Sequence, residues 1–305
     1  MGNTFRDTIP TELVTHITAI CGTPGEQWFK DLPKQIADLE AAWTITIHEP
    51  FPGIEYNFVA PATTEDGIEV VIKIAPPFET VEIYGEAKHL RTLGGQGSVK
   101  LLAEDRDRRA IMIERALPGE ALFARFKNDA AACVEPAIGV LRSILRPPPA
   151  DMSDVVTLDQ WFNNFRRYAE TKFPADYAQK AFEIYERLSI QPGRTFYLHG
   201  DFHPGKVVTA TRSPFLAIDP KGIVGHVGYE IAVFLNNLHW WQKGTIDVCE
   251  FLRGAVRQFA TAFDFEEQEL REWAYAGMVI GAWWTYDDMP ELYNNEVALA
   301  DIWDV

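Results

Sequence analysis

The stretch HGDFHPGKVV, from His199 to Val208, gathers two histidines, one aspartate, two glycines and a proline. Proline restricts the backbone and glycine frees it, so this composition predicts a rigid, irregular loop. Such loops often carry function, and Asp201 is the acid of this one. The strand-like VVTA and FLAID that follow flank a turn and predict a hairpin that ends at a second acid, Asp219. We therefore expect Asp201 and Asp219 to converge.

These two carboxylates suit the transfer of a phosphoryl group. One can accept a proton from an attacking hydroxyl while the other holds a divalent metal on a phosphate. The order His199, Asp201 and then Asp219 after a hairpin is similar to the catalytic loop and metal-binding aspartate of kinases. An isolated His-Gly-Asp is weak evidence, because such residues more often cap a turn. The whole constellation is much harder to match by accident, so it predicts a kinase-like centre.

The residues that a kinase-like centre requires upstream are present in the required order. Lys73 is an isolated cation in the apolar strand VVIKIA, where a kinase small lobe carries the lysine that holds ATP phosphates. The alternative is a solvent-facing lysine on an edge strand. A glutamate on the following helix should pair with Lys73, and Glu86 in YGEAKHL is the best candidate. Glu82, one turn earlier on the same face, is the other candidate.

The first third of the chain predicts helices followed by a sheet with one inserted helix. Residues 10–42 have helical spacing with a break at residues 22–25, and residues 43–75 change to alternating and β-branched sequence. We expect three antiparallel strands there, in WTITI, YNFVA and IEVVIKIA. Residues 79–93 return to helical spacing and end at Gly94, after which SVKLLAED and AIMIERA predict two more strands.

A hinge is expected at RALPGEAL, from Arg115 to Leu122, where a Pro-Gly pair follows an apolar strand. Beyond it nearly every segment has helical spacing, apart from the hairpin region at residues 195–219. The sequence therefore predicts two domains. Residues 1–115 would form N-terminal helices and an ATP-binding small lobe, and residues 116–305 would form a helical catalytic and substrate-binding lobe.

Six segments together resemble the aminoglycoside phosphotransferase family, and within it the branch of streptomycin 6-phosphotransferases and hydroxyurea-resistance kinases. They are FPGIEYNFVAPA, VVIKIA, GEAKHLRTL, IMIERALPGEAL, YLHGDFHPGKVV and AIDPKGIVG, in matched order between about Trp43 and Leu235. The resemblance implies a bilobal, protein-kinase-like α+β fold. Its small N-terminal lobe would have a five-stranded antiparallel sheet plus one helix, and its larger C-terminal lobe would be mainly helical. The resemblance also implies ATP, Mg²⁺, transfer to a small-molecule hydroxyl, and antibiotic resistance.

The same resemblance implies a role for each matched residue. Asp201 would be the catalytic base and Asp219 the principal Mg²⁺ ligand, while His199 would brace the loop. A buried ion pair would position the ATP phosphates, and the hinge backbone would meet the adenine. The residues implied for these ATP contacts are Lys73, Glu86, Glu114 and Ala116.

One residue departs from the family pattern. The family has asparagine, a metal ligand, five residues after the catalytic aspartate, where this chain has Lys206. A lysine ammonium has only donors and cannot coordinate a cation. Three interpretations are open: an impaired pseudokinase that binds nucleotide or a small ligand, a one-metal kinase in which Lys206 contacts phosphate, and an engineered or incidental change. A Lys206 side chain that extends into solvent is a further alternative. Because Asp201, Asp219 and Lys73 are all present, an enzyme is favoured over a scaffold.

A second departure lies in GIVGHVGYEIAVFL, where the family tends to have an acid at the position of His226. We expect His226 at the surface. Glu230, near the start of the following helix, would either complement the helix dipole or orient the catalytic loop.

The acceptor is expected to meet acids and aromatic rings of the helical lobe. HWWQ and GAWWTYDDMPE supply both, with Trp284, Asp287 and Asp288 as candidate contacts for a cationic acceptor. The alternative is structural, because tryptophan pairs in helices are usually core residues. The formal charge of -16 is compatible with a cationic small molecule, although acidic surfaces also serve solubility alone.

The composition excludes several classes of partner. With 28 Lys and Arg against 44 Asp and Glu, a nucleic-acid-binding surface is not expected. No apolar run has the length of a membrane span and the N-terminus lacks the layout of a signal peptide, so we expect no membrane partner and a cytoplasmic location. A protein kinase is disfavoured, because no long activation segment ending in Ala-Pro-Glu follows Asp219.

Overall fold

The chain forms two compact units. The structure, a computed structural model, describes residues 9–78, 82–242, 248–288, 290, 293 and 296–305 of the 305 residues. The smaller unit consists of Met1–Gly95 with Val99–Leu117, and the larger one of Gln96–Ser98 with Pro118–Val305. The sequence-based division at residue 115 did not set apart the insert Gln96–Ser98, whose backbone pairs within the larger unit.

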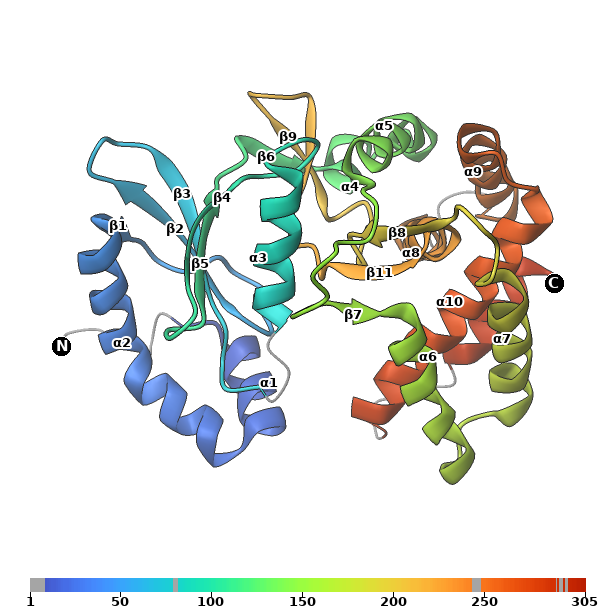
Figure 1. Cartoon of the computed structure of the whole chain (residues 1–305), viewed down its shortest axis with the longest axis horizontal. Helices are drawn as coiled ribbons and strands as arrows, with labels where there is room; N and C mark the ends of the chain where they lie inside the picture. Colours follow the sequence, from blue (N-terminus) through green and yellow to red (C-terminus); the bar gives the residue numbers. More distant parts are fainter. Residues whose placement is uncertain (1–8, 79–81, 243–247, 289, 291–292, 294–295) are drawn as a thin grey trace. The chain divides into compact units, whose positions relative to one another are not determined.

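The smaller unit is an antiparallel sheet with helices packed on it (Figure 1). The strands lie in the order β1-β2-β3-β5-β4, and each neighbouring pair is antiparallel. The expected five-stranded sheet with one inserted helix is confirmed. The elements of this unit are α1 (Thr11–Cys21), α2 (Thr23–Trp43), β1 (Ile45–Ile47), β2 (Phe58–Thr64), β3 (Glu69–Ile74), α3 (Glu82–Leu93), β4 (Leu101–Asp105) and β5 (Ala110–Glu114).

The alternation along β3 decides which of its side chains meets which helix, because successive side chains of a strand point to opposite faces. Ile72 and Ile74 are fully buried in the cluster that the sheet forms with α1 and α2, where Leu13 and Leu32 lie. Lys73 stands between the two isoleucines and therefore points to the other face of the sheet. On that face it meets α3.

The break between α1 and α2 is shorter than predicted. It consists of Gly22 alone, whose φ of 56° is a left-handed conformation that glycine adopts without strain. α2 begins directly afterwards with a proline in its first turn, where the missing N–H has no cost.

The larger unit is mainly helical, as expected, and contains two small sheets with the strand orders β10-β9-β6 and β7-β11-β8. The predicted hairpin is present as β9 and β10, but β6, β7 and β11 were not predicted. Part of the expected hinge is β6, which pairs with β9. The elements are β6 (Pro118–Ala121), α4 (Leu122–Arg125), η2 (Ala130–Cys133), α5 (Val134–Ile144), β7 (Val156–Thr157), α6 (Leu158–Phe165), η3 (Arg166–Glu170), α7 (Ala175–Leu188), β8 (Thr195–Leu198), β9 (Val207–Ala210), β10 (Phe215–Ala217), β11 (Ile223–His226), α8 (Val227–Gln242), α9 (Val248–Phe263), α10 (Glu267–Asp288) and η4 (Glu296–Trp303).

Helices α8 and α10 are joined by a buried polar contact. The side-chain amide of Asn236 donates to the carbonyl of Ala274 at 3.0 Å and its oxygen accepts from the indole of Trp303 at 3.0 Å. Each polar group of this amide is thereby satisfied, as a buried amide requires. None of the described helices is both long enough and apolar enough to cross a membrane.

Candidate active site

The loop between β8 and β9 carries Asp201, whose side chain is half-buried. The ring of His199 fixes the loop backbone at this point, since Nε2 lies 2.8 Å from the carbonyl oxygen of Ile218 and Nδ1 accepts the N–H of Asp201 at 3.3 Å. Phe202 is fully buried and stacks on Phe234 of α8, with ring centroids 5.6 Å apart. The loop is thus anchored on both sides of its acid.

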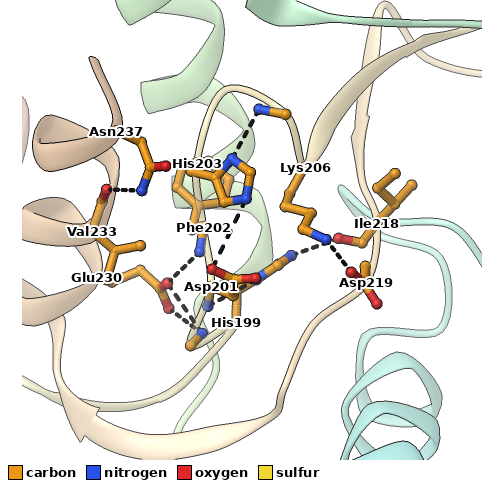
Figure 2. Close-up of polar contacts among 12 residues, drawn as sticks. His199, Asp201, Phe202, His203, Lys206, Ile218, Asp219, Glu230, Val233 and Asn237 are labelled. Carbon is orange, nitrogen blue, oxygen red and sulfur yellow. Dashed lines mark hydrogen bonds and ion pairs between the residues drawn. The ribbon is translucent and has the colours of Figure 1, made fainter. Parts of the chain in front are cut away.

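Backbone hydrogen bonds join this loop to the segment that carries Asp219. The carbonyl of His199 accepts the N–H of Lys221 at 2.7 Å and that of Gly222 at 3.1 Å. Asp201 and Asp219 therefore belong to one hydrogen-bonded framework. Figure 2 shows both carboxylates and the bond from His199 to Ile218, the residue before Asp219. The backbone thus joins the segments that carry the two acids, and the convergence of their carboxylates stays a prediction.

Glu230, at the start of α8, holds the same loop from the helical side. Its fully buried carboxylate accepts the backbone N–H of Gly200 at 3.0 Å and that of Phe202 at 3.2 Å. Burial raises the pKa of Glu230 to about 7 and the charge of Asp201 contributes to the rise, while the two N–H donors oppose it. Of the two roles considered for Glu230, orientation of the loop is the one that its contacts support.

The raised pKa of Glu230 predicts a specific dependence of stability on pH. The folded protein keeps a proton on Glu230 that the unfolded chain releases, between pH 4.5 and about 7. The stabilising contribution of Glu230 is therefore complete below pH 4.5 and is lost as the pH rises through about 7. Relative to Glu230→Gln, we expect the free energy of unfolding to fall by up to about 1.4 kcal/mol per pH unit in this window.

Urea unfolding of both proteins at pH 5, 6, 7 and 8 measures this difference. A difference between wild type and Glu230→Gln that stays constant across this range would contradict the raised pKa.

His203 lies beside Asp201, and nothing in the sequence singles it out beyond its place in the same loop. Its Nδ1 accepts the N–H of Gly205 at 3.1 Å, and its Nε2 lies 3.9 Å from Oδ1 of Asp201, beyond hydrogen-bond distance. Burial, with a further effect from the charge of Lys206, lowers the pKa of His203 to about 4. The ring is neutral at pH 7, so it does not neutralise the negative charge of Asp201.

Lys206 and Asp219 form an ion pair in which the lysine ammonium donates to Oδ2 of the carboxylate (Figure 2). The interpretation that places Lys206 in solvent, away from the site, is therefore wrong. Asp219 has a φ of 61°, in a region that residues other than glycine adopt at some cost and that recurs at functional sites. A carboxylate expected to hold a metal is thus paired with a cation of the chain itself.

In the smaller unit, Lys73 and Glu86 form a buried ion pair. Nζ of Lys73 lies 2.5 Å from Oε2 of Glu86, and each residue is only 4% exposed. The alternative of a solvent-facing lysine on an edge strand is wrong, because β3 is the central strand of the sheet. Glu82, the other candidate partner, is exposed in the first turn of α3. Desolvating two charges costs about as much free energy as their attraction provides, so such a pair indicates function more than stability.

The two residues expected to meet adenine differ in their backbone environment. Glu114 ends β5, and its N–H already donates to the carbonyl of Lys100 at 2.9 Å. Ala116 follows outside the strand, where its backbone is not part of the sheet's hydrogen-bond ladder. The geometry therefore favours the backbone of Ala116 over the N–H of Glu114 for this contact.

Trp284 is half-buried on α10 and lies at the end of an aromatic chain. Its ring contacts Trp161 of α6, with centroids 5.1 Å apart and the planes at 83°. Trp161 in turn contacts Tyr229, with centroids 6.0 Å apart, and Tyr229 precedes the loop anchor Glu230. Trp161 and Tyr229 were not found from the sequence, where nothing distinguishes them from other aromatic residues.

Asp287, one of the two acids expected to contact a cationic acceptor, is not an unpaired charge. Asp287 pairs with Arg167, whose Nη2 lies 2.7 Å from its Oδ1, so the protein itself balances its charge. The side chains of Asp288 and of the two tryptophans in HWWQ lie outside the described residues.

The expectation that His226 lies at the surface is wrong. His226 is 2% exposed, stacks on Trp273 at 4.7 Å between ring centroids, and accepts the N–H of Gly228 at 3.0 Å through Nδ1. Burial lowers its pKa to about 4. The surface assignment failed because the residue ends β11, a short strand that the sequence pattern did not indicate.

Residues 43–289 match the model of a family described as aminoglycoside/hydroxyurea antibiotic resistance kinase. A hydroxyurea phosphotransferase of Kitasatospora aureofaciens is 27% identical over 308 residues, which cover 96% of this chain and 85% of the relative. A streptomycin 6-kinase of Streptomyces glaucescens is 26% identical over 293 residues, with 92% and 91% covered. The solved structure of an amicoumacin kinase with AMP-PNP and Ca²⁺ superposes with a TM-score of 0.60 at 15% identity, covering 90% of this chain and 96% of that one. The expected protein-kinase-like α+β fold is confirmed.

Proposed function

The chain belongs to the aminoglycoside/hydroxyurea antibiotic resistance kinase family, and we propose that it phosphorylates a hydroxyl group of a streptomycin-like aminoglycoside or of a related sugar or aminocyclitol. As a member of this family it is a phosphotransferase with an alcohol group as acceptor, and ATP is its phosphate donor. The identity of the acceptor and the roles of individual residues are the proposed part.

The observation that carries the proposal is the loop of Asp201, whose backbone is held by His199 and Glu230. In the proposed reaction Asp201 accepts the proton of the acceptor hydroxyl while the hydroxyl oxygen attacks the γ-phosphorus. The bond between the γ-phosphorus and the β,γ-bridging oxygen breaks, and ADP leaves with that electron pair. A base in a fixed position typically contributes about 10²- to 10⁴-fold to the rate. The neighbouring ring of His203, whose pKa burial lowers to about 4, adds no positive charge beside this base at pH 7. His199 and Glu230 act only by positioning the loop.

The smaller unit is proposed to supply contacts to the nucleotide. Lys73, oriented by Glu86, is proposed to hold the phosphates, and the backbone of Ala116 to meet the adenine. The buried ammonium group of Lys73 suits the negative charge of the phosphates. The backbone of Ala116 suits the adenine, because it lies outside the hydrogen-bond ladder of the sheet.

Asp219 is proposed to hold Mg²⁺, which would neutralise negative charge on the transferred phosphate. Within the described part of the chain no three His, Cys, Asp or Glu side chains gather around one point. Mg²⁺ is usually bound by one or two carboxylates together with substrate phosphates, so Asp219 fits a metal that binds with the nucleotide. Position 206 does not fit a second metal, because an ammonium group cannot coordinate one.

A cationic acceptor would meet the aromatic faces of Trp284 and Trp161. An ammonium or guanidinium group over such a ring gains about 0.5 to 2 kcal/mol. The formal charge of -16 adds long-range attraction for a cation. Asp287 and Asp288 would add negative charge at the end of α10, the first of them within its pair with Arg167.

A second candidate function, binding of nucleotide or a small ligand without efficient transfer, is favoured by one observation, the pairing of Lys206 with Asp219. In this alternative the ammonium group occupies the carboxylate that the metal needs. Lys206→Asn would then restore activity that the natural chain lacks.

Transfer from radiolabelled ATP in the presence of Mg²⁺ to streptomycin, other aminoglycosides, hydroxyurea and simple sugars tests the proposal. We expect phosphorylation of streptomycin-like acceptors, and a KM for them that rises about 3- to 30-fold in Trp284→Ala with little change in kcat. Transfer to hydroxyurea alone would contradict the acceptor class. Absence of both transfer and nucleotide binding would contradict the function, and transfer by Lys206→Asn alone would establish the impaired alternative.

A further inference from the structure

The contact between Lys206 and Asp219 is built into the hairpin that carries both residues. Val207 and Ala217 are opposite one another in β9 and β10, and the next bond along the hairpin runs from the N–H of Ile218 to the carbonyl of Lys206 at 2.9 Å. Asp219 follows Ile218 directly and leaves the strand with a φ of 61°, one residue beyond the position opposite Lys206. The lysine therefore approaches this carboxylate from a fixed backbone position.

Stability does not explain the pair. The two side chains are 25% and 38% exposed, and ion pairs of such exposure typically contribute about 0 to 1 kcal/mol. The ammonium group has three donors, of which one is used on Oδ2 of Asp219, and the described residues supply no acceptor for the others. Partial exposure and unused donors suit a group that meets a further anion.

The ammonium group of Lys206 takes the place that a divalent metal ion has in a two-metal kinase site. In a two-metal kinase site a carboxylate and an asparagine oxygen hold divalent ions against the phosphates. Here Oδ2 of Asp219 is taken by an ammonium group, and the residue that would supply the second oxygen ligand is that same lysine. The site keeps a positive charge at this place without a metal ion to carry it.

Building on the proposed function, we infer that Lys206 is a resident cation in place of one divalent ion, so that the chain binds ATP with a single metal. The ammonium group stays beside Asp219 and donates its other N–H groups to phosphate oxygens of the nucleotide. Asp219 then holds only one metal ion. Lys206 is a nucleotide-binding residue in this arrangement, and its charge replaces that of the missing ion.

The number of Mn²⁺ ions bound per chain with AMP-PNP, measured by equilibrium dialysis and electron paramagnetic resonance, tests the inference without any turnover. We expect one Mn²⁺ in the natural chain and two in Lys206→Asn, which regains an oxygen ligand. Lys206→Met supplies neither charge nor ligand, so we expect one Mn²⁺ and a Kd for AMP-PNP that rises about tenfold or more. Lys127→Asn, at an exposed lysine of the larger unit, is the matched control and should behave as the natural chain.

The outcomes separate the inference about Lys206 from the proposed kinase function on which it rests. Two Mn²⁺ ions in the natural chain, or an unchanged AMP-PNP affinity in Lys206→Met, overturns the inference about Lys206 and leaves the kinase function standing. Failure of every variant to bind AMP-PNP overturns the proposed function itself. Thermal unfolding of each variant without nucleotide shows whether the fold is intact, and we expect shifts of at most a few degrees because the pair is exposed.

Discussion

Replacing Asp201 by asparagine should lower kcat about 10³-fold while the Kd for ATP changes by less than about threefold. The amide keeps the size of the side chain and cannot accept a proton from the acceptor hydroxyl. The loop should keep its conformation, because His199 and Glu230 hold its backbone. Steady-state kinetics with the best acceptor, together with nucleotide titration, measure the two quantities separately.

Two comparisons make this result specific to the base. Asp66→Asn, at an exposed turn of the smaller unit, removes a carboxylate of the same kind and should leave kcat unchanged. The logarithm of kcat/KM in the natural chain should fall on the acid side with the titration of a carboxylate, and Asp201→Asn should lose this limb. If Asp201→Asn keeps more than a tenth of the natural kcat, Asp201 is not the base.

The smaller unit was predictable because its signals are local. Alternation in β2 and helical spacing in α3 are properties of neighbouring residues, and each agrees with the burial that the fold imposes. In β3 the last three residues are all buried, because both faces of this central strand are covered. The strands β6, β7 and β11 have four residues or fewer and exist only because a distant partner satisfies their backbone. No local pattern indicates such strands, and the misplacement of His226 followed from one of them.

In the candidate site, too, contacts between residues close in sequence could be predicted, and contacts between distant residues could not. The joining of the segments that carry His199, Asp201 and Asp219 could be expected because the hairpin between them is short in sequence. The pairing of Arg167 with Asp287 spans 120 residues and has no signal in either segment. Lys206 shows what the sequence could and could not supply, since its misfit with a metal site was visible, whereas its ion pair with Asp219 required the geometry.

Replacing Lys73 by methionine should have the second large effect, and it acts on stability and on nucleotide binding together. Glu86 would be left as a buried charge without its lysine, and breaking such a pair typically costs about 3–5 kcal/mol. We expect urea unfolding to show a loss of this order. Binding of ATP should weaken as well, but a partly unfolded protein would show the same symptom, so the single variant does not separate the two causes.

The double variant Lys73→Met and Glu86→Leu separates them. Replacing a buried ion pair by apolar side chains of similar volume is often neutral or stabilising, so the free energy of unfolding should return to within about 1 kcal/mol of the natural value. If the pair exists to hold ATP phosphates, kcat/KM for ATP should stay at least about 10²-fold below that of the natural chain despite the restored fold. Recovery of kcat/KM together with stability would show that the pair is structural, and that the phosphates are held by other groups. We expect kcat/KM for ATP to stay low in the double variant. Lys73 is only 4% exposed in the central strand, where an apolar side chain would serve the fold as well as a cation.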